Sequence, residues 1–174
     1  TALAAGEDGE LWLGFERGGL RRWRRGGQVR ESAAEVAAAL GISRGLGDDW
    51  LRFVGYKAWV DGIMGSSGSL FFAPYDHDKG NKGYPRHIMF PEGAEGAALR
   101  MTEAQRYTDF GPGNLEKLLE QAVATGLPPH VHAIGDKGNR ILLDVYEKVL
   151  TAHDLVDKDH RWRVIHAQHI HPDD

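Results

Sequence analysis

The fold of this chain is decided by one stretch, Pro129-His130-Val131-His132-Ala133-Ile134-Gly135-Asp136. It has the pattern of a short β-strand that ends in a Gly-Asp turn and leads into a helix. By the two-residue period of a strand, His130 and His132 fall on one face and Val131 falls on the other. A second such stretch, residues 162–169, follows the helix and also has histidine near its end. Two strands joined by a helix form a βαβ unit whose strand ends can hold a metal.

The composition is that of a globular protein, and 174 residues are enough for one domain with a substantial core. A formal net charge of -4 argues against nucleic-acid binding, which usually needs a basic surface. Because there is no apolar run that could cross a bilayer and no signal peptide at Thr1, we expect no membrane association and a cytoplasmic location. The chain has 0 cysteines, so any metal must bind histidine, carboxylate or a modified lysine.

Residues 1–30 form a first segment of uncertain origin. Asp8-Gly9 is a typical hairpin turn, and apolar residues alternate along residues 11–15. Gly18-Gly19 then turns the chain into a second run, so we expect a β-hairpin. The segment resembles one blade of the propellers of two-component sensor proteins, which leaves a sensor fragment as one interpretation.

From residue 31 to residue 174 the pattern is that of an α/β domain. We expect a helix over 32–40, a strand over 51–60, a loop over 62–96, a short helix from 102, a helix over 115–125, a strand from 130, a helix over 138–150 and a strand over 161–167. Strands alternate with helices and no antiparallel hairpin interrupts them, which favours a parallel sheet. Within the loop, the Asp-His-Asp of residues 76–78 could be a metal cluster, although such trios are usually solvated.

Ionisable side chains stand at the ends of these strands, where α/β folds place their sites. Lys57 interrupts an apolar strand that ends at Asp61. Either Lys57 is paired or modified, or it reaches solvent from an edge strand. The next two strands carry His132 and His166, and His166 shares the parity of Val164. Each histidine alone could be structural, whereas two at matched strand ends could share one metal ion.

Three motifs carry a family resemblance: Val54-Gly55-Tyr56-Lys57-Ala58-Trp59-Val60-Asp61-Gly62, His132-Ala133-Ile134-Gly135-Asp136 and Arg163-Val164-Ile165-His166-Ala167-Gln168-His169. Together they resemble the amidohydrolase superfamily and, within it, the YtcJ-like group called amidohydrolase family 3. The resemblance covers about residues 36–174 and implies a partial (β/α)8 TIM barrel, about strands 4 to 6 with their helices. It also implies that Lys57, His132 and His166 are the catalytic and metal-binding residues.

The same resemblance implies a function. A divalent metal, zinc in the first place, would activate water to hydrolyse C–N bonds of amide type other than peptide bonds. The substrate would be a small amide-like molecule, and no organic cofactor is implied. Lys57 would be carboxylated and would bind the metal through oxygen. Asp136 is expected to cap the following helix or to support His132.

Two features of the superfamily are missing from this chain, the His-x-His of the first strand and the Asp of the eighth. We therefore expect a fragment that is inactive alone. The alternative is a non-catalytic metal-binding or interaction module on the same α/β scaffold. Association of two copies into a homo-oligomer stays open.

Overall fold

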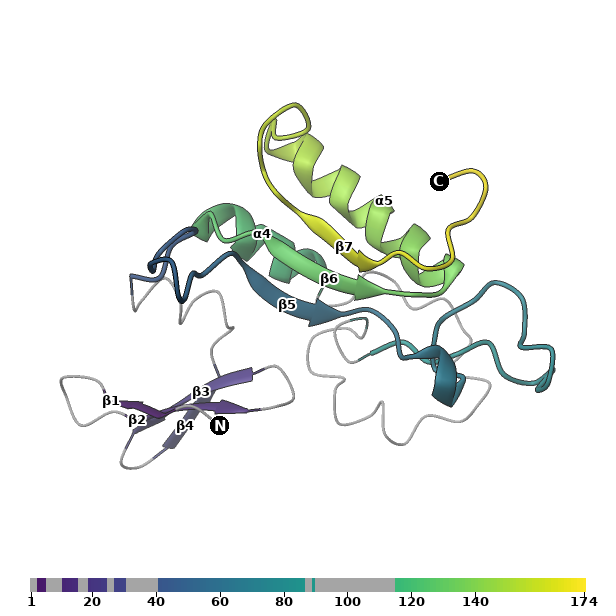
Figure 1. Ribbon diagram of the computed structural model, residues 1–174, viewed down its shortest axis with the longest axis horizontal. Coiled ribbons are helices and arrows are strands. Elements are labelled where there is room, and N and C mark those ends of the chain that lie inside the picture. Colours follow the sequence, from purple (N-terminus) through teal and green to yellow (C-terminus); the bar gives the residue numbers. More distant parts are fainter. Residues whose placement is uncertain are drawn as a thin grey trace.

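The computed structural model of the chain describes residues 41–86, 89 and 115–174, together with the backbone of four N-terminal strands. It is a mixed α/β structure with one antiparallel and one parallel sheet (Figure 1). The helices expected over 32–40 and from 102 lie outside the described residues.

The N-terminal sheet is antiparallel throughout. Its strands are β1 (Leu3–Ala5), β2 (Leu11–Phe15), β3 (Gly19–Arg24) and β4 (Gly27–Arg30), in the order β1-β2-β3-β4. The predicted hairpin is present as the β2–β3 pair, whose register begins with Phe15 opposite Gly19. One further strand pairs on each side of it, so the segment forms a small sheet rather than an isolated hairpin.

The C-terminal sheet is parallel, as predicted from the alternation of strands and helices. It consists of β5 (Tyr56–Trp59), β6 (Pro129–Ala133) and β7 (Arg163–His166), in the order β5-β6-β7. The register places Trp59 opposite His132, and His132 opposite Ile165. The carboxyl ends of the three strands therefore meet at one edge of the sheet.

Strand β5 is shorter than the strand predicted over 51–60. Its pairing with β6 begins where the amide of Tyr56 donates to the carbonyl of Pro128, so the residues before it have no partner there. The carboxylate of Asp48 instead accepts the amides of Trp50 and Leu51 in a local turn. The apolar side chains of residues 50–54 are exposed, which the apolar pattern alone could not reveal.

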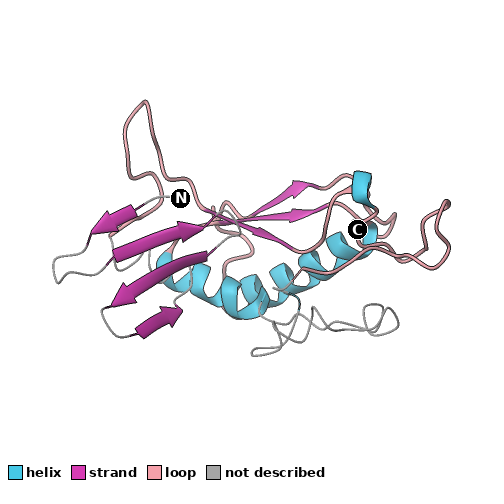
Figure 2. Ribbon diagram, turned by 90° about the horizontal axis from the view of Figure 1, so that it is seen from below, coloured by secondary structure: helices cyan, strands magenta, loops and turns pink. Residues whose placement is uncertain are grey.

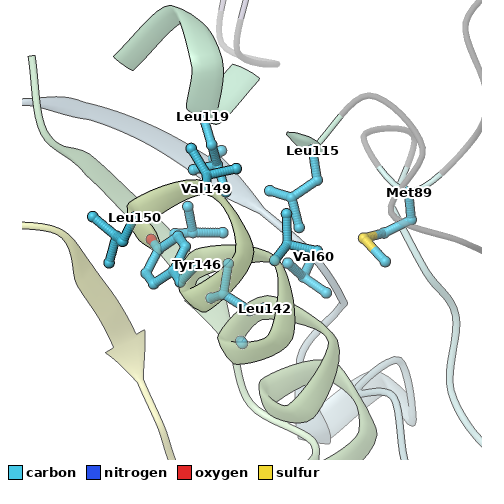
Figure 3. Close-up of a cluster of buried hydrophobic side chains, with 12 residues drawn as sticks. Val60, Met89, Leu115, Leu119, Leu142, Tyr146, Val149 and Leu150 are labelled. Carbon is cyan, nitrogen blue, oxygen red and sulfur yellow. The ribbon is translucent and has the colours of Figure 1, made fainter. Parts of the chain in front are cut away.

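Two helices cover the same face of the parallel sheet (Figure 2). Helix α4 (Leu115–Thr125) has the predicted bounds and ends at Gly126, whose φ of 68° is the left-handed conformation that glycine tolerates. Helix α5 (Asp136–Ala152) extends slightly beyond its predicted range at both ends. Their apolar stripes meet the sheet and enclose one core (Figure 3).

The core fixes which face of each strand points away from the helices. Its members are Ala58, Val60, Met89, Leu115, Leu119, Val131, Ala133, Leu142, Val145, Tyr146, Val149 and Leu150. By strand parity, the face opposite this core carries Lys57 and Trp59 on β5 and His130 and His132 on β6. Within the described residues, no helix has the length and apolar character needed to cross a bilayer.

Candidate active site

The candidate site lies at the carboxyl ends of the parallel strands and is built around His132. His132 is buried, and its side chain is 4% exposed. Its Nε2 lies 3.1 Å from the carbonyl oxygen of Gly62 and 3.2 Å from Oδ1 of Asp61. Both neighbours are hydrogen-bond acceptors, so we assign the ring proton to Nε2. Nδ1 then holds the free lone pair.

His166 is brought to His132 by a change in backbone direction at the end of β7. The register puts His166 opposite Ala133, on the parity of Val164, whose side chain packs against the core. His166 and Ala167 have φ values of 78° and 44°, so the strand conformation ends there. The ring centroids of His132 and His166 are 4.6 Å apart in an edge-to-face arrangement. By strand parity alone, His166 would point toward the core, on the face of the sheet opposite His132.

The residue that sequence reasoning left without a role is Asp61. Its side chain is fully buried, and its two oxygens accept backbone N–H groups from two separate segments. Oδ2 accepts the amides of Leu70 at 2.8 Å and Gly135 at 2.9 Å, and Oδ1 accepts the amide of Ile134 at 3.1 Å. Its position just before Gly62, at the end of an apolar strand, was the one available signal.

Lys57 is not brought to the histidine pair. It lies opposite His130 in the register, one pleat before Trp59 and His132. Its Nζ donates to the carbonyl of Ala58 at 3.0 Å and lies 4.4 Å above the ring of Trp59. Desolvation lowers the pKa of Lys57 to about 8. The side chain is only partly desolvated, because it reaches solvent from the edge of the sheet.

Asp136 has neither of the two roles predicted for it. The residue that caps helix α5 is Gly135, and no side chain caps that helix. Oδ1 of Asp136 accepts the amides of Phe72 at 3.0 Å and Lys137 at 2.6 Å. It therefore holds the loop after β5 to the start of α5, and the support of His132 comes from Asp61.

The other polar candidates also have local roles. The ring of His169 packs edge-to-face on Phe71, with centroids 5.3 Å apart. Asp76 and Asp78 are exposed, and Asp76 pairs with Lys79. In the described part of the chain, no group of three or more histidine, cysteine or carboxylate side chains is placed to hold a metal ion.

The histidine pair nevertheless fits a metal as two of its ligands. Two imidazoles that share a tetrahedral zinc, with Zn–N bonds of ~2.0–2.1 Å, have ring centres roughly 5 Å apart, close to the spacing of His132 and His166. A metal-binding histidine almost always donates its other N–H to a carboxylate or backbone carbonyl. His132 has both acceptors beside Nε2. The donor set is suitable, and a catalytic zinc would need at least one more protein ligand.

Residues 8–174 match the model of the amidohydrolase family. The chain belongs to that family. The match confirms the resemblance seen in the strand-end motifs, and it includes strands β2, β3 and β4 of the antiparallel sheet.

Other comparisons place this amidohydrolase segment beside much longer proteins. It is 35% identical over 124 residues to Protein LONG AFTER FAR-RED 3 of Arabidopsis thaliana, a match that covers 71% of this chain and 17% of that protein. An uncharacterized metal-dependent hydrolase from Pyrococcus horikoshii matches with 27% identity and a TM-score of 0.49, over 67% of this chain and 19% of that one. A second such hydrolase, from Pyrococcus furiosus, matches with 24% identity and a TM-score of 0.46, over 66% of this chain and 19% of that one.

Proposed function

We propose that this chain is the metal-binding part of a hydrolase that cleaves amide-type C–N bonds other than peptide bonds. The observation that carries the proposal is the juxtaposition of His132 and His166 at the ends of neighbouring parallel strands. Membership of the amidohydrolase family supports the reaction class. The (β/α)8 barrel remains part of this proposal, with β5, β6 and β7 as three consecutive strands of it.

In this proposal each side chain has a defined task. His132 donates its Nε2 proton to the carbonyl of Gly62 and the carboxylate of Asp61, which leaves Nδ1 to bind the metal. His166, at the end of β7, supplies the second imidazole. When bound, a divalent ion, zinc in the first place, supplies Lewis acidity that polarises a carbonyl and makes water a better nucleophile near neutral pH. The loop after Asp61 would cover a small amide-like substrate.

Lys57 is the proposed third ligand, in carboxylated form. Its neutral amine nitrogen would attack CO2 and release one proton, which leaves an anionic carbamate whose oxygens can bind a metal. Since burial lowers the pKa of Lys57 to about 8, about a tenth of the amine is neutral at neutral pH. Its Nζ would have to leave the carbonyl of Ala58 and turn along the sheet toward His132.

A second candidate function is a metal-binding or interaction module without catalysis. One observation favours it: the described residues bring two histidines together and hold Lys57 apart from them. We propose that catalysis needs further strands of a longer protein, because the chain spans 17% of its plant relative.

The test is a titration of the purified chain with Co2+ and Zn2+. We expect stoichiometric binding that is lost in His132→Ala and in His166→Ala and is weakened in Lys57→Ala when bicarbonate is present. His153→Ala is the matched control, because His153 pairs with Glu120 on the surface of the helices. Circular dichroism of each variant establishes that it is folded. A folded wild-type chain that binds neither ion would overturn the proposal, as would unchanged binding in both histidine variants.

A further inference from the structure

The buried carboxylate of Asp61 joins three parts of the site. It stands at the end of β5, it accepts the amide of Leu70 in the following loop, and it accepts the amides of Ile134 and Gly135 in the β6–α5 turn. Gly135 is the N-cap of α5, so the carboxylate also lies at the positive end of a helix. These donors hold both oxygens in place and offset the cost of burying the charge.

The carboxylate of Asp61 also lies close to His132: its Oδ1 is 3.2 Å from the Nε2 atom of the ring. The carbonyl oxygen of Gly62, the residue after Asp61, approaches the same nitrogen at 3.1 Å. Two acceptors fixed by the β5 end therefore face one ring nitrogen. A ring with its proton on Nδ1 would turn a lone pair toward both of them, which is unfavourable in a buried site.

We infer that Asp61 is a positioning residue for His132: it holds the ring in the Nε2–H tautomer and leaves Nδ1 open to a ligand. This inference rests on the proposed function, because the use of the open nitrogen is metal binding. Ring orientation and tautomer are properties of the metal-free chain, so they can be measured separately from metal binding.

Asp61→Asn is the informative substitution, because it keeps the volume and removes one acceptor. If the new amide group faces Leu70 and Gly135, two backbone donors lose their acceptor. If it faces Ile134 and His132 instead, the two short bonds to Oδ2 survive, and the ring is driven toward the tautomer with its proton on Nδ1. The second arrangement costs less, since it takes the Oδ1 acceptor from one backbone amide, that of Ile134, rather than from two, and the ring proton can move.

Asp136→Asn is the matched control. Asp136 also accepts backbone amides and holds the same loop to α5, but its contacts are with Phe72 and Lys137 rather than with His132. A general effect of losing a loop anchor would appear in both variants. An effect on the ring of His132 should appear in Asp61→Asn alone.

The experiment uses nitrogen NMR of the full chain with labelled histidine, followed by titration with Zn2+. We expect the wild-type ring of His132, assigned by comparison with His132→Ala, to carry its proton on Nε2. In Asp61→Asn we expect loss of that tautomer and a zinc affinity lower by about 10–100-fold, with Asp136→Asn like wild type. A wild-type proton on Nδ1 would overturn the inference, and so would a folded Asp61→Asn protein with the wild-type tautomer and affinity.

One outcome separates this inference from the proposed function. A tautomer that depends on Asp61 in a chain that binds no zinc would support the positioning role and overturn the metal-binding function. Should Asp61→Asn fail to fold, Asp61→Glu retains the charge but displaces the carboxylate. We expect Asp61→Glu to show the same loss of affinity, and wild-type affinity in that variant would overturn the inference.

Discussion

At the scale of single residues, the site depends on how closely two backbones approach. The carbonyl oxygen of Leu70 lies against Gly135, where an added Cβ would be 1.9 Å from it. Gly135 has a φ of -73°, so its backbone conformation is open to any residue and the requirement for glycine is purely steric. Only a residue without Cβ lets the loop after β5 reach the β6–α5 turn and deliver the amide of Leu70 to Asp61.

We therefore expect Gly135→Ala to destabilise the fold by about 2–3 kcal/mol, in the upper part of the range for overpacking, because the obstructing atom belongs to the backbone. Gly65→Ala is the matched control: a Cβ at Gly65 meets nothing within 4 Å, and we expect a change within about 0.5 kcal/mol. Urea denaturation of both variants measures the difference. Equal stabilities of the two variants would show that the backbone of Leu70 does not pack against Gly135.

The residue scale also shows where sequence reasoning reached its limit. His132 and His166 were selected as candidates because strand ends and ligand chemistry are visible in the sequence, and the structure brings their rings together. The role of Asp61 was not, because its acceptor sites are filled by backbone amides, which every residue has, and two of these lie 73 and 74 residues away. The approach of His166 to His132 depends on a positive φ at a non-glycine residue, which the periodicity of a strand does not predict.

At the scale of elements, β5 is the described element whose predicted bounds differ most from the structure. The bounds of α4 follow from its apolar stripe and from Gly126, both of which are local signals. The length of β5 is set instead by where β6 begins to pair with it, which is a long-range property. The parity of β5 also decides that Lys57 stands on the face opposite the core, beside Trp59.

The position of Lys57 on β5 predicts a pH dependence of stability. Burial lowers the pKa of Lys57 to about 8 from its usual 10.5, so between these values the unfolded chain binds a proton that the folded chain has released. Stability should therefore rise as pH increases through this window. Lys57→Met should be the more stable protein below pH 8, and its advantage should shrink toward pH 10.5. Chemical denaturation in metal-free, CO2-depleted buffer tests this, and a constant difference between the two proteins would contradict it.

At the scale of the whole molecule, the family match includes the parallel sheet and strands β2, β3 and β4 of the antiparallel sheet. The sequence did not predict that residues 8–30 belong to the match, because the alternation of a hairpin is common to many folds. Ahead of β5, the apolar side chains of Trp50 and Leu51 are 96% and 69% exposed. Contiguous apolar exposure of this kind usually marks a surface that another chain segment or subunit covers.

We expect this segment to drive self-association of the chain, which would produce the homo-oligomer that the sequence leaves open. Trp50→Ser combined with Leu51→Ser should shift the protein toward monomer, because the apolar area available for burial falls. Val156→Ser is the control, since Val156 is also exposed, at 56%, but lies after α5. Light scattering over a range of concentrations measures the mass. A wild-type chain that is monomeric throughout, or a double variant that associates equally well, would contradict the expectation.

The peptide groups on either side of Leu70 have a mechanical consequence. The amide of Leu70 is bound to Asp61, and its carbonyl accepts the amide of Gly138 at 3.1 Å, so this one residue is fastened to both β5 and α5. Beyond Leu70, the amide of Phe72 is bound to Asp136 of α5, and the amide of Tyr84 returns to the carbonyl of Gly68. The loop is therefore tied to the sheet and to α5 at several points along its length. A molecule that enters over this loop would meet a fixed rim, and the floor formed by Gly62 and His132 would keep its shape.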